Sequence, residues 1–417
     1  MMKGHAWLAL GVTAGLALSG CRGSSAGAGP SVTIVVNVPV GALPYVARFS
    51  EQGAQLAADR VNAAGGVKVG GKSYSIKLEV LDNQNSPSSS LDNIRRAAAD
   101  KAVAIIDDGY TVDATYQAAA QAGLPILVDY DGNATLIDTD KRPNVFRIAP
   151  PDDAVAAKLT GYVAGKGLKL ALLHDDSEYG KDGATQFQAA LQQKSLTPNP
   201  NLEIPSTATS LSDKALAVKQ AGATGVIIWA RAPVLAQMVR ALREGGVTAP
   251  IFAGPTAEDP VVRTQLADHP DWVEGLTYAS FRITTESGPD AWDKFRKAYE
   301  DHKFNGGGPD YKVGVQASDH KDVVQPPDWQ IFPYDMVYLV KSALETAGTV
   351  NTSGGKIIAA LNGAQITSAN GDNRGWKKDN HEGIVDDDIY FATFEDMKFK
   401  PVQDDPLSKS LVPIDQE

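Results

Sequence analysis

Residues 31–66 read SVTIVVNVPVGALPYVARFSEQGAQLAADRVNAAGG, and this stretch decides the fold. Residues 32–38 form a short apolar run rich in β-branched side chains, which is typical of a buried strand. Residues 49–62 have helical periodicity and are followed by Gly65-Gly66, where glycine readily ends a helix. The stretch therefore predicts a strand followed by a helix, which is the repeating unit of α/β proteins.

The same unit recurs in two successive series. In the first, further strands are expected at residues 75–81, 103–106 and 125–128, with helices at 88–100 and 112–121. In the second, helices are expected at residues 152–166, 181–194, 211–220 and 233–244, with strands at 169–174, 202–204, 225–229, 250–253 and 276–279. A helix at residues 334–347 and strands at 389–394 and 398–402 close the chain. We predict an α/β protein with two doubly wound, Rossmann-like lobes, each built on a largely parallel sheet.

The first 21 residues predict export. Lys3 precedes an apolar run at residues 6–17 that is too short to span a bilayer, and Leu18-Ser19-Gly20-Cys21 follows it. This end resembles the bacterial lipobox, so we expect a signal peptide at residues 1–20 and lipidation of Cys21, the only cysteine; the alternative is a lone buried thiol. The Gly- and Ser-rich residues 21–30 are expected to be a flexible tether. We therefore predict a membrane-anchored, extracytoplasmic lipoprotein.

The sequence argues against two functions: nucleic-acid binding, because of the charge of the chain, and P-loop nucleotide binding, because of the elements around the one matching motif. The formal net charge is -11 and no run of lysine or arginine is present, which argues against nucleic-acid binding. Residues 66–73, GVKVGGKS, match the P-loop pattern of nucleotide-binding proteins. A P-loop follows a strand and precedes a helix, whereas here the expected helix comes first and the expected strand second. A glycine-rich turn is the better interpretation.

Motifs for catalysis and for cofactors are missing from the sequence. It has no Gly-x-Ser-x-Gly and no His-Glu-x-x-His, and its 6 histidines are scattered. His381-Glu382 and the aspartates at residues 386–388 could be imagined as a metal site, but an acidic turn before a strand is the preferred interpretation. We expect no enzymatic activity, no cofactor and no metal site.

Three local patterns carry a family resemblance: ADRVNAAGGV at residues 58–67, the stretch at 74–87 ending in Ser86-Pro87, and HDDSEYG at residues 174–180. In this order and spacing they resemble the solute-binding proteins of branched-chain amino acid ABC transporters, the leucine/isoleucine/valine-binding type. The resemblance implies a type I periplasmic-binding fold, in which three crossovers join two lobes that close on one ligand. It implies lobe one at residues 31–148 and 278–380, and lobe two at residues 149–277 and 381–417.

Parallel sheets bind ligands beyond the carboxyl ends of their strands, and the resemblance implies the same places here. The candidate ligand-binding residues are Tyr45, Asp108, Tyr110, Thr111, Asp131, Gly132, Asn133, Tyr179, Arg231, Thr256, Phe332 and Tyr334. In the family, hydroxyl groups and helix amides near the position of Thr111 hold a ligand carboxylate, although Thr111 could equally cap its helix. Tyr179 occupies the family's aromatic position in lobe two, although it could simply be a packing residue.

The chain departs from the family in its charges. Thr256 stands where the amino-acid binders have a glutamate that pairs with the ligand ammonium, and Glu258 comes two positions later. Arg231 and the aspartates of lobe one, Asp108, Asp129 and Asp131, are additional charges near the expected cleft. Enclosed charges need partners. Three arrangements stay open: an Arg231–aspartate latch across the cleft, a ligand that itself carries charge, or aspartates that face solvent.

The resemblance implies a function, and one unusual segment modifies it. We expect a monomeric receptor without catalysis that captures a small polar solute, an amino acid or a related amide or carboxylate. It would deliver the solute to a membrane permease with a cytoplasmic ATPase; the alternative is a sensor that relays ligand occupancy to a membrane signalling protein. Residues 304–328 are irregular and rich in Gly and Pro, and we hypothesise that they border the cleft and reshape the pocket.

Overall fold

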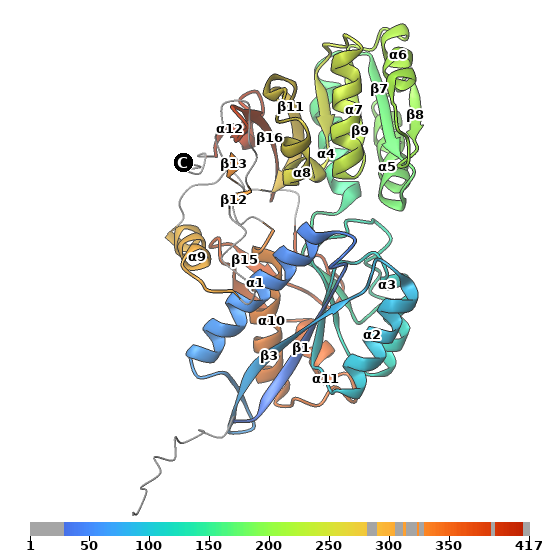
Figure 1. Ribbon diagram of the computed structural model, residues 1–417. Coiled ribbons are helices and arrows are strands. Elements are labelled where there is room, and N and C mark those ends of the chain that lie inside the picture. The colour runs from blue at the N-terminus through green and yellow to red at the C-terminus, as the bar shows by residue number, and fades with distance from the viewer. Residues whose placement is uncertain are drawn as a thin grey trace, which may run out of the picture.

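The computed structural model describes residues 29–281, 290–304, 312–313, 323–324, 329–384 and 388–411, and the chain forms two α/β lobes (Figure 1). The expected leader, the start of the tether and most of the 304–328 segment lie outside these residues. Within them, no helix is long and apolar enough to cross a membrane.

Lobe one, at the bottom of Figure 1, is built on a six-stranded sheet. Its strands, in spatial order, are β2 (Val67–Val69), β3 (Lys72–Asp82), β1 (Ser31–Val38), β4 (Ala104–Asp107), β5 (Ile126–Val128) and β6 (Val145–Arg147). All are parallel except β2, and Val36 of β1 lies opposite both Val80 and Ile106. The predicted parallel sheet of this lobe is confirmed.

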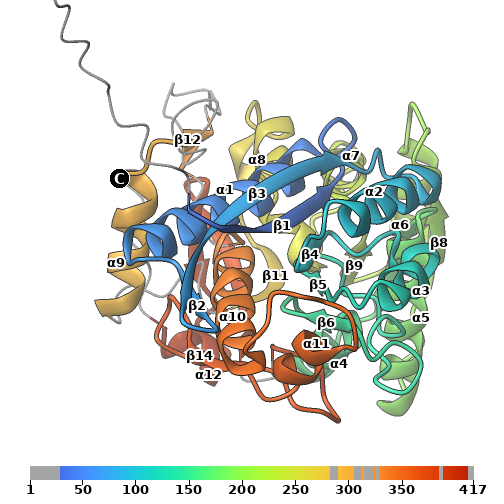
Figure 2. The same ribbon diagram turned by 90° about the horizontal axis from the view of Figure 1, so that it is seen from below.

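Helices cover both faces of this sheet because successive strand residues point to opposite sides. Val32, Ile34 and Val36 pack with one layer, whereas Val35 packs with the other. Figure 2 shows α1 and α10 on one side of the strands and α2 and α3 on the other. The first layer is α1 (Pro44–Ala63), α9 (Asp290–Glu300), α10 (Ile331–Ala347) and α11 (Lys356–Leu361), and the second is α2 (Pro87–Ala99) and α3 (Val112–Gln121). The near-continuous apolar sequence of β1 is explained by burial on both faces.

Lobe two is built on a seven-stranded sheet. Its spatial order is β17 (Lys398–Pro401), β16 (Ile389–Glu395), β11 (Leu276–Phe281), β10 (Ile251–Ala253), β9 (Gly225–Trp229), β7 (Leu170–Asp175) and β8 (Asn201–Ile204). Only β16 and β17 run antiparallel to their neighbours. Helices α4 (Asp152–Ala164) and α5 (Glu178–Gln193) cover one face, and α6 (Ser212–Gln220), α7 (Ala232–Glu244) and α8 (Pro260–Gln265) cover the other.

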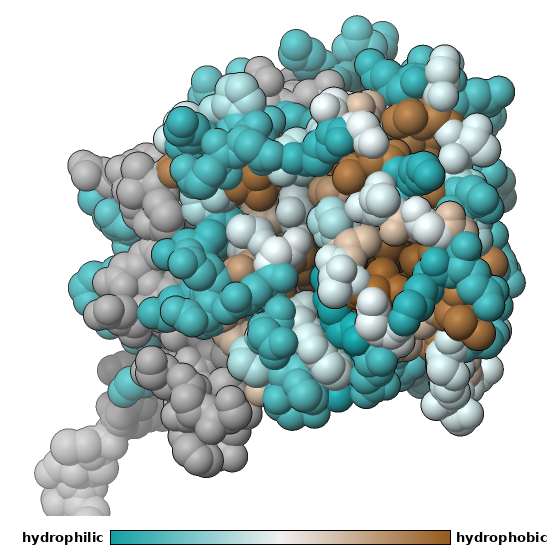
Figure 3. Space-filling model, turned by 90° about the horizontal axis from the view of Figure 1, so that it is seen from above, coloured by the Kyte–Doolittle hydropathy of each residue, from teal (hydrophilic) through white to brown (hydrophobic). Residues whose placement is uncertain are grey.

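Short elements complete the fold. They are η1 (Pro255–Glu258), η2 (Pro270–Trp272), α12 (Pro406–Lys409), and the two-stranded pairs β12 (Lys312–Val313) with β13 (Val323–Val324) and β14 (Gln365–Thr367) with β15 (Asn373–Gly375). The end of lobe two that faces away from lobe one is mostly hydrophilic, with apolar residues showing between polar ones (Figure 3). Among the described residues, the exposed large apolar side chains are Val40 and Leu216, so most apolar side chains lie inside the lobes.

Two predicted lobe boundaries need correction. The boundary between residues 277 and 278 falls inside β11, and Tyr278 and Ala279 are both buried in lobe two. Residue 381 is also too early for the return to lobe two, because the Arg147 amide donates to the His381 carbonyl at 2.9 Å and the Gly383 amide donates to the Arg147 carbonyl at 2.8 Å. Lobe two resumes with β16. The crossovers therefore follow β6, β11 and the segment around Gly383.

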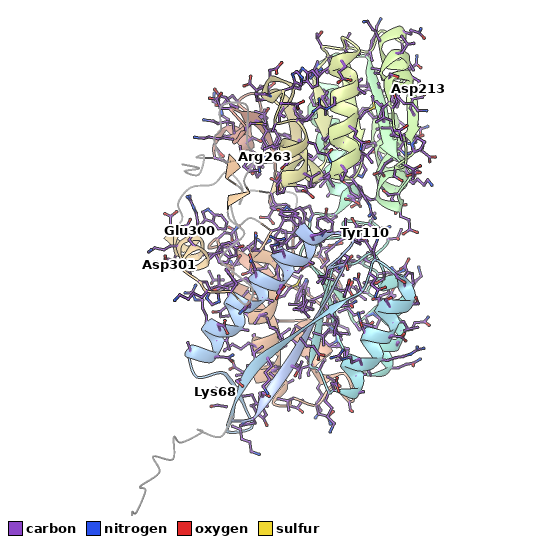
Figure 4. The ribbon with its side chains drawn as sticks, in the orientation of Figure 1. Lys68, Tyr110, Asp213, Arg263, Glu300 and Asp301 are labelled. Carbon is purple, nitrogen blue, oxygen red and sulfur yellow. The ribbon has the colours of Figure 1, made fainter. Side chains whose placement is uncertain are left out.

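The P-loop-like residues form a hairpin. β2 pairs antiparallel with β3, and Gly70 and Gly71 join them with φ of +55° and +76°. A two-residue turn with positive φ at both positions suits the twist of a hairpin and favours glycine. Lys68 lies at the end of lobe one far from Tyr110 (Figure 4), and its Nζ donates to the Gly65 carbonyl at 2.7 Å. The expected order of helix, glycine-rich turn and strand is confirmed.

Candidate functional site

Two neighbouring hollows lie between the lobes, where the carboxyl ends of both sheets meet. The larger, here called the outer groove, has a volume of about 910 Å³ and is lined by residues of both lobes, among them Tyr45, Thr111 and Arg231. The smaller, the inner cavity, has a volume of about 20 Å³. It is lined by Tyr110, Tyr130, Asp131, Gly132, Pro150, Asp152, Tyr179, Pro255, Thr256 and Trp329. Tyr110 and Tyr130 border both hollows, and Figure 4 shows Tyr110 at the junction of the lobes.

Lobe one contributes the loops after β4 and β5. Gly109 has φ of +104°, and a Cβ built on it would lie 2.4 Å from the Cβ of Asp131. Glycine at this position therefore lets the two loops touch, because any other side chain would both strain the backbone and push Asp131 away. The contact places Tyr110 beside Tyr130, with ring centroids 5.9 Å apart in an edge-to-face arrangement.

Aromatic rings continue the wall of lobe one. The rings of Tyr130 and Trp329 have centroids 5.1 Å apart, and Phe49 packs against both. Tyr45 packs edge-to-face on Phe49 at 5.6 Å. Trp329 follows the irregular 304–328 segment directly and lies two residues before α10, so the residue next to that segment reaches the inner cavity. Most of that segment lies outside the described residues, and its expected effect on the pocket stays a hypothesis.

Lobe two contributes Tyr179, whose ring stacks on a buried tryptophan. The indole of Trp229, at the end of β9, is fully buried and stacks on Tyr179 with a centroid distance of 5.1 Å. Gly183 and Gly254 leave the space for this indole, since a Cβ on either would lie within 2.5 Å of its ring atoms. Thr256 also lines the inner cavity, but its hydroxyl donates to the Ala230 carbonyl at 2.9 Å.

Arg231 crosses the cleft without forming the expected aspartate latch. Its guanidinium lies over the ring of Tyr110, 4.7 Å from the centroid, which is the geometry of a cation–π interaction. No ion pair joins Arg231 to an aspartate anywhere in the described part of the chain. The Arg231 amide donates to Asp175 Oδ2 at 2.7 Å, which fixes the start of α7 beside the β7–α5 turn. The latch hypothesis is therefore wrong for this structure: the partner across the cleft is an aromatic ring.

Two of the three aspartates of lobe one do not face solvent. Asp108 and Asp129 are fully buried and Asp131 is half-buried, so the solvent-facing alternative is wrong for the first two. Asp108 accepts a hydrogen bond from the Asn83 side chain, whereas neither carboxyl oxygen of Asp129 has a hydrogen-bond partner. Burial raises the pKa of all three carboxyls, that of Asp131 to about 6. Desolvation favours the neutral acid wherever no cation compensates the charge.

A buried arginine holds the loop that carries Asp131. The Arg147 side chain, 1% exposed, donates to both oxygens of Glu382 at 2.9 and 2.5 Å and to the carbonyls of Asp131 and Asn133 at 3.1 and 2.8 Å. The Asn133 side chain in turn donates to Asp182 of lobe two. This network joins two crossovers to the loop at the inner cavity, so it couples the cavity to the hinge region.

The structure brings most predicted site residues together and leaves four outside the hollows. Tyr45, Tyr110, Thr111, Asp131, Gly132, Tyr179, Arg231 and Thr256 line one or both of them. Asp108 lies beneath the loop, and Asn133 instead bridges the lobes. Phe332 packs on Phe281 and Trp329, and Tyr334 packs on Phe295, so both belong to the core of lobe one.

Tyr130, Asp152, Asp259 and Trp329 line the hollows but are absent from the predicted set. Tyr130 lies inside the loop that the sequence singles out after the strand at 125–128, so the sequence contains a signal that places it at the cleft. Asp152 and Trp329 each begin or precede a helix that follows a crossover. Only the tertiary fold shows that these helix starts face the cleft.

His381 and Glu382, considered above as part of a metal site, instead make contacts that hold the fold together. His381 Nδ1 hydrogen-bonds the Val145 carbonyl at 2.8 Å, its Nε2 hydrogen-bonds Asn362 Oδ1 at 2.7 Å, and Glu382 pairs with Arg147. The residues of the acidic turn before Asp388 lie outside the described ones. Across the described ranges, no group of three or more His, Cys, Asp or Glu side chains could hold a metal ion.

Comparisons with known proteins agree with this architecture. The family model described as "Periplasmic binding protein" matches residues 32–398. A Leu/Ile/Val-binding protein homolog 3 of Brucella melitensis is 24% identical over 366 residues, which cover 85% of this chain and 90% of the relative. The solved type 1 periplasmic binding protein of Bordetella pertussis has a TM-score of 0.72 at 19% identity, covering 87% of this chain and 96% of that one. Isoleucine-bound LivJ of Streptococcus pneumoniae has a TM-score of 0.71 at 20% identity, covering 88% and 97%. The predicted two-lobed type I fold is confirmed.

Proposed function

Because the chain belongs to the periplasmic binding protein family, we propose that it is an extracytoplasmic receptor that captures a small polar solute between its lobes and delivers it to an ABC permease. The observation that carries this proposal is the pair of neighbouring hollows at the carboxyl ends of both sheets, lined by aromatic and carboxylate side chains from both lobes. Clefts with apolar walls and a few convergent polar groups are typical of small-molecule sites. Closure of the lobes would turn binding energy into a shape that a permease recognises.

The solute is proposed to be an amino acid or a related amide or carboxylate, in keeping with relatives named for leucine, isoleucine and valine binding. The chain must hold such a solute with its own residues. The hydroxyl of Thr256 is engaged by the Ala230 carbonyl, and the fully buried Glu258 accepts a hydrogen bond from Ser280. We therefore propose that other carboxylates recognise an ammonium group of the solute.

Thermal unfolding with and without candidate solutes tests solute capture. A ligand at a hundred times its dissociation constant stabilises the folded state by about 2.7 kcal/mol, which raises the melting temperature by a few degrees. The panel is amino acids, diamines, short amides and aromatic carboxylates. Trp329→Leu should weaken the shift, because Trp329 lines the inner cavity, whereas Trp272→Leu in η2 should leave it unchanged. The absence of any shift across the panel would refute the proposal.

We also propose that a lipid on Cys21 anchors the mature protein to a membrane. Several acyl chains at about 0.8 kcal/mol per buried methylene hold a protein durably at a membrane surface. Cys21→Ser should move the protein from the membrane fraction to the soluble fraction without changing solute affinity. Retention of the Cys21→Ser protein in the membrane fraction would contradict the lipid anchor and leave solute capture intact.

A further inference from the structure

Asp152 is a buried carboxylate at the wall of the inner cavity. It is the first residue of α4 and is 4% exposed, and its Oδ2 has no hydrogen-bond partner among the described residues. A backbone hydrogen bond holds Asp152 next to Gly132, because the Asp152 amide donates to the Gly132 carbonyl at 2.7 Å. A Cβ on Gly132 would lie 2.3 Å from Asp152 Oδ1, so only glycine there admits the carboxylate. The site is therefore constructed around this group.

The surroundings of Asp152 contain an excess of negative charge. Burial raises its pKa well above the usual range, and Asp131, Asp182 and Asp153 raise it further, while Arg147 lowers it. The guanidinium of Arg147 is already shared by Glu382 and two carbonyls. A desolvated carboxylate without a cation is costly, and a cation that enters the cavity would remove that cost.

Aromatic rings complete the cavity. Tyr110, Tyr130, Tyr179 and Trp329 line it together with Asp131 and Asp152. The faces of such rings attract cations and repel anions. The hydroxyl that was expected to hold a ligand carboxylate, that of Thr111, donates instead to Ser90 Oγ at 2.7 Å. The Thr111 donor, which borders the outer groove, is therefore used elsewhere, and the aspartates and rings that line the inner cavity favour a cation over an anion.

The size of the cavity restricts what can enter. A hollow of 10–15 Å³ holds about one water molecule, so a cavity of about 20 Å³ holds one group of that size, which is the size of an ammonium group. The outer groove, of about 910 Å³, begins at the same two tyrosines, Tyr110 and Tyr130. Because these tyrosines line both hollows, a solute head group in the inner cavity would lie next to a solute body in the groove.

We propose that the inner cavity binds the protonated amine of the solute, with Asp152 as its counter-ion, Asp131 beside it and the aromatic rings around it. This proposal rests on the proposed solute capture and names the chemical class of the solute: an organic ammonium compound. The cation is selected by one buried carboxylate at the start of α4 rather than by the residue at position 256.

Matched probes test the amine. With the full chain purified in detergent, 1,4-diaminobutane and leucine carry an amine, and 1,4-butanediol and 4-methylpentanoate are their counterparts without one. We expect calorimetric binding and thermal stabilisation with an amine probe and none with its counterpart. Binding of the counterparts but not of the amines would overturn the amine site and leave solute capture standing. The absence of binding by every probe, together with no shift across the wider panel, would overturn both proposals.

Two adjacent aspartates provide the matched variants. Asp152→Asn should weaken amine binding at least tenfold, whereas Asp153→Asn, an exposed position in the same first turn of α4, should leave it unchanged. The melting temperature of the unliganded Asp152→Asn protein should be unchanged or higher, because an unpaired buried carboxylate is removed. Unaltered amine affinity in Asp152→Asn, or a large fall in its unliganded melting temperature, would overturn the assignment.

Discussion

Replacing Gly183 by alanine should destabilise lobe two, although the same change at Gly161 should stabilise it. Both glycines lie inside helices of this lobe, Gly183 in α5 and Gly161 in α4. In a helix interior, alanine is more favourable than glycine by about 1 kcal/mol, so propensity alone predicts a gain at both positions. The difference must come from what the new methyl group meets.

The geometry sets the size of the effect. A Cβ at Gly183 would lie 1.9 Å from Nε1 of Trp229, whose indole is fully buried, whereas a Cβ at Gly161 would meet nothing within 4 Å. Overpacking a buried site costs about 1–3 kcal/mol, and a rigid ring at this distance requires the upper end of that range. The expected net changes are a loss of about 2 kcal/mol for Gly183→Ala and a gain of about 1 kcal/mol for Gly161→Ala.

Urea unfolding followed by circular dichroism measures both variants at the same pH. Gly183→Ala should also weaken solute binding, because Tyr179 stacks on Trp229 and would move with it, whereas Gly161→Ala should bind normally. The reasoning would be refuted by a Gly183→Ala protein as stable as the unmodified one. A destabilised Gly161→Ala protein would show that propensity does not govern that position.

Four aspartates have a pKa raised to about 6, so the folded protein binds more protons than the unfolded chain between about pH 4 and pH 6. The free energy of unfolding should therefore fall across this window, and unfolding curves measured from pH 4 to 7 would contradict this by rising. These aspartates are Asp107, Asp131, Asp259 and Asp335. Asp129→Asn should stabilise the protein by about 1–2 kcal/mol at pH 7 and by little at pH 4, because it removes a buried acid without a hydrogen-bond partner, and equal effects at both pH values would argue against this. Glu382→Ala should cost about 2–4 kcal/mol by leaving Arg147 without its counter-ion, and an unchanged urea midpoint would show that the two carbonyl acceptors are sufficient.

The two-lobed architecture follows from family membership, whereas the proposed amine site follows from the residues of this chain. Membership accounts for two lobes around a cleft, and the named relatives suggest amino-acid solutes. The inner cavity of this chain is lined by Asp131 and Asp152, and the hydroxyl of Thr256 donates to a backbone carbonyl. The amine assignment follows from these residues of this chain, and it predicts a preference that the family name alone would not specify.

The sequence by itself determined the local structure and the general place of the site. Apolar runs such as residues 32–38 and 225–229 became strands within a residue or two, and Gly70-Gly71 became a turn, because strand burial and positive φ depend on neighbouring residues. The sequence also places the strand ends at the border of the cleft, since parallel topology alone brings them to one edge of the sheet.

Only the tertiary structure decided which charges are buried and what they face. Arg231 lies over Tyr110, more than a hundred positions earlier in the chain, and Asp152 lines the inner cavity together with Trp329. Phe332 turned into the core while Trp329 reached the cavity, because α10 begins at Ile331, earlier than the expected residue 334. Burial and pairing are set by segments that meet only after folding, so no local pattern contains them.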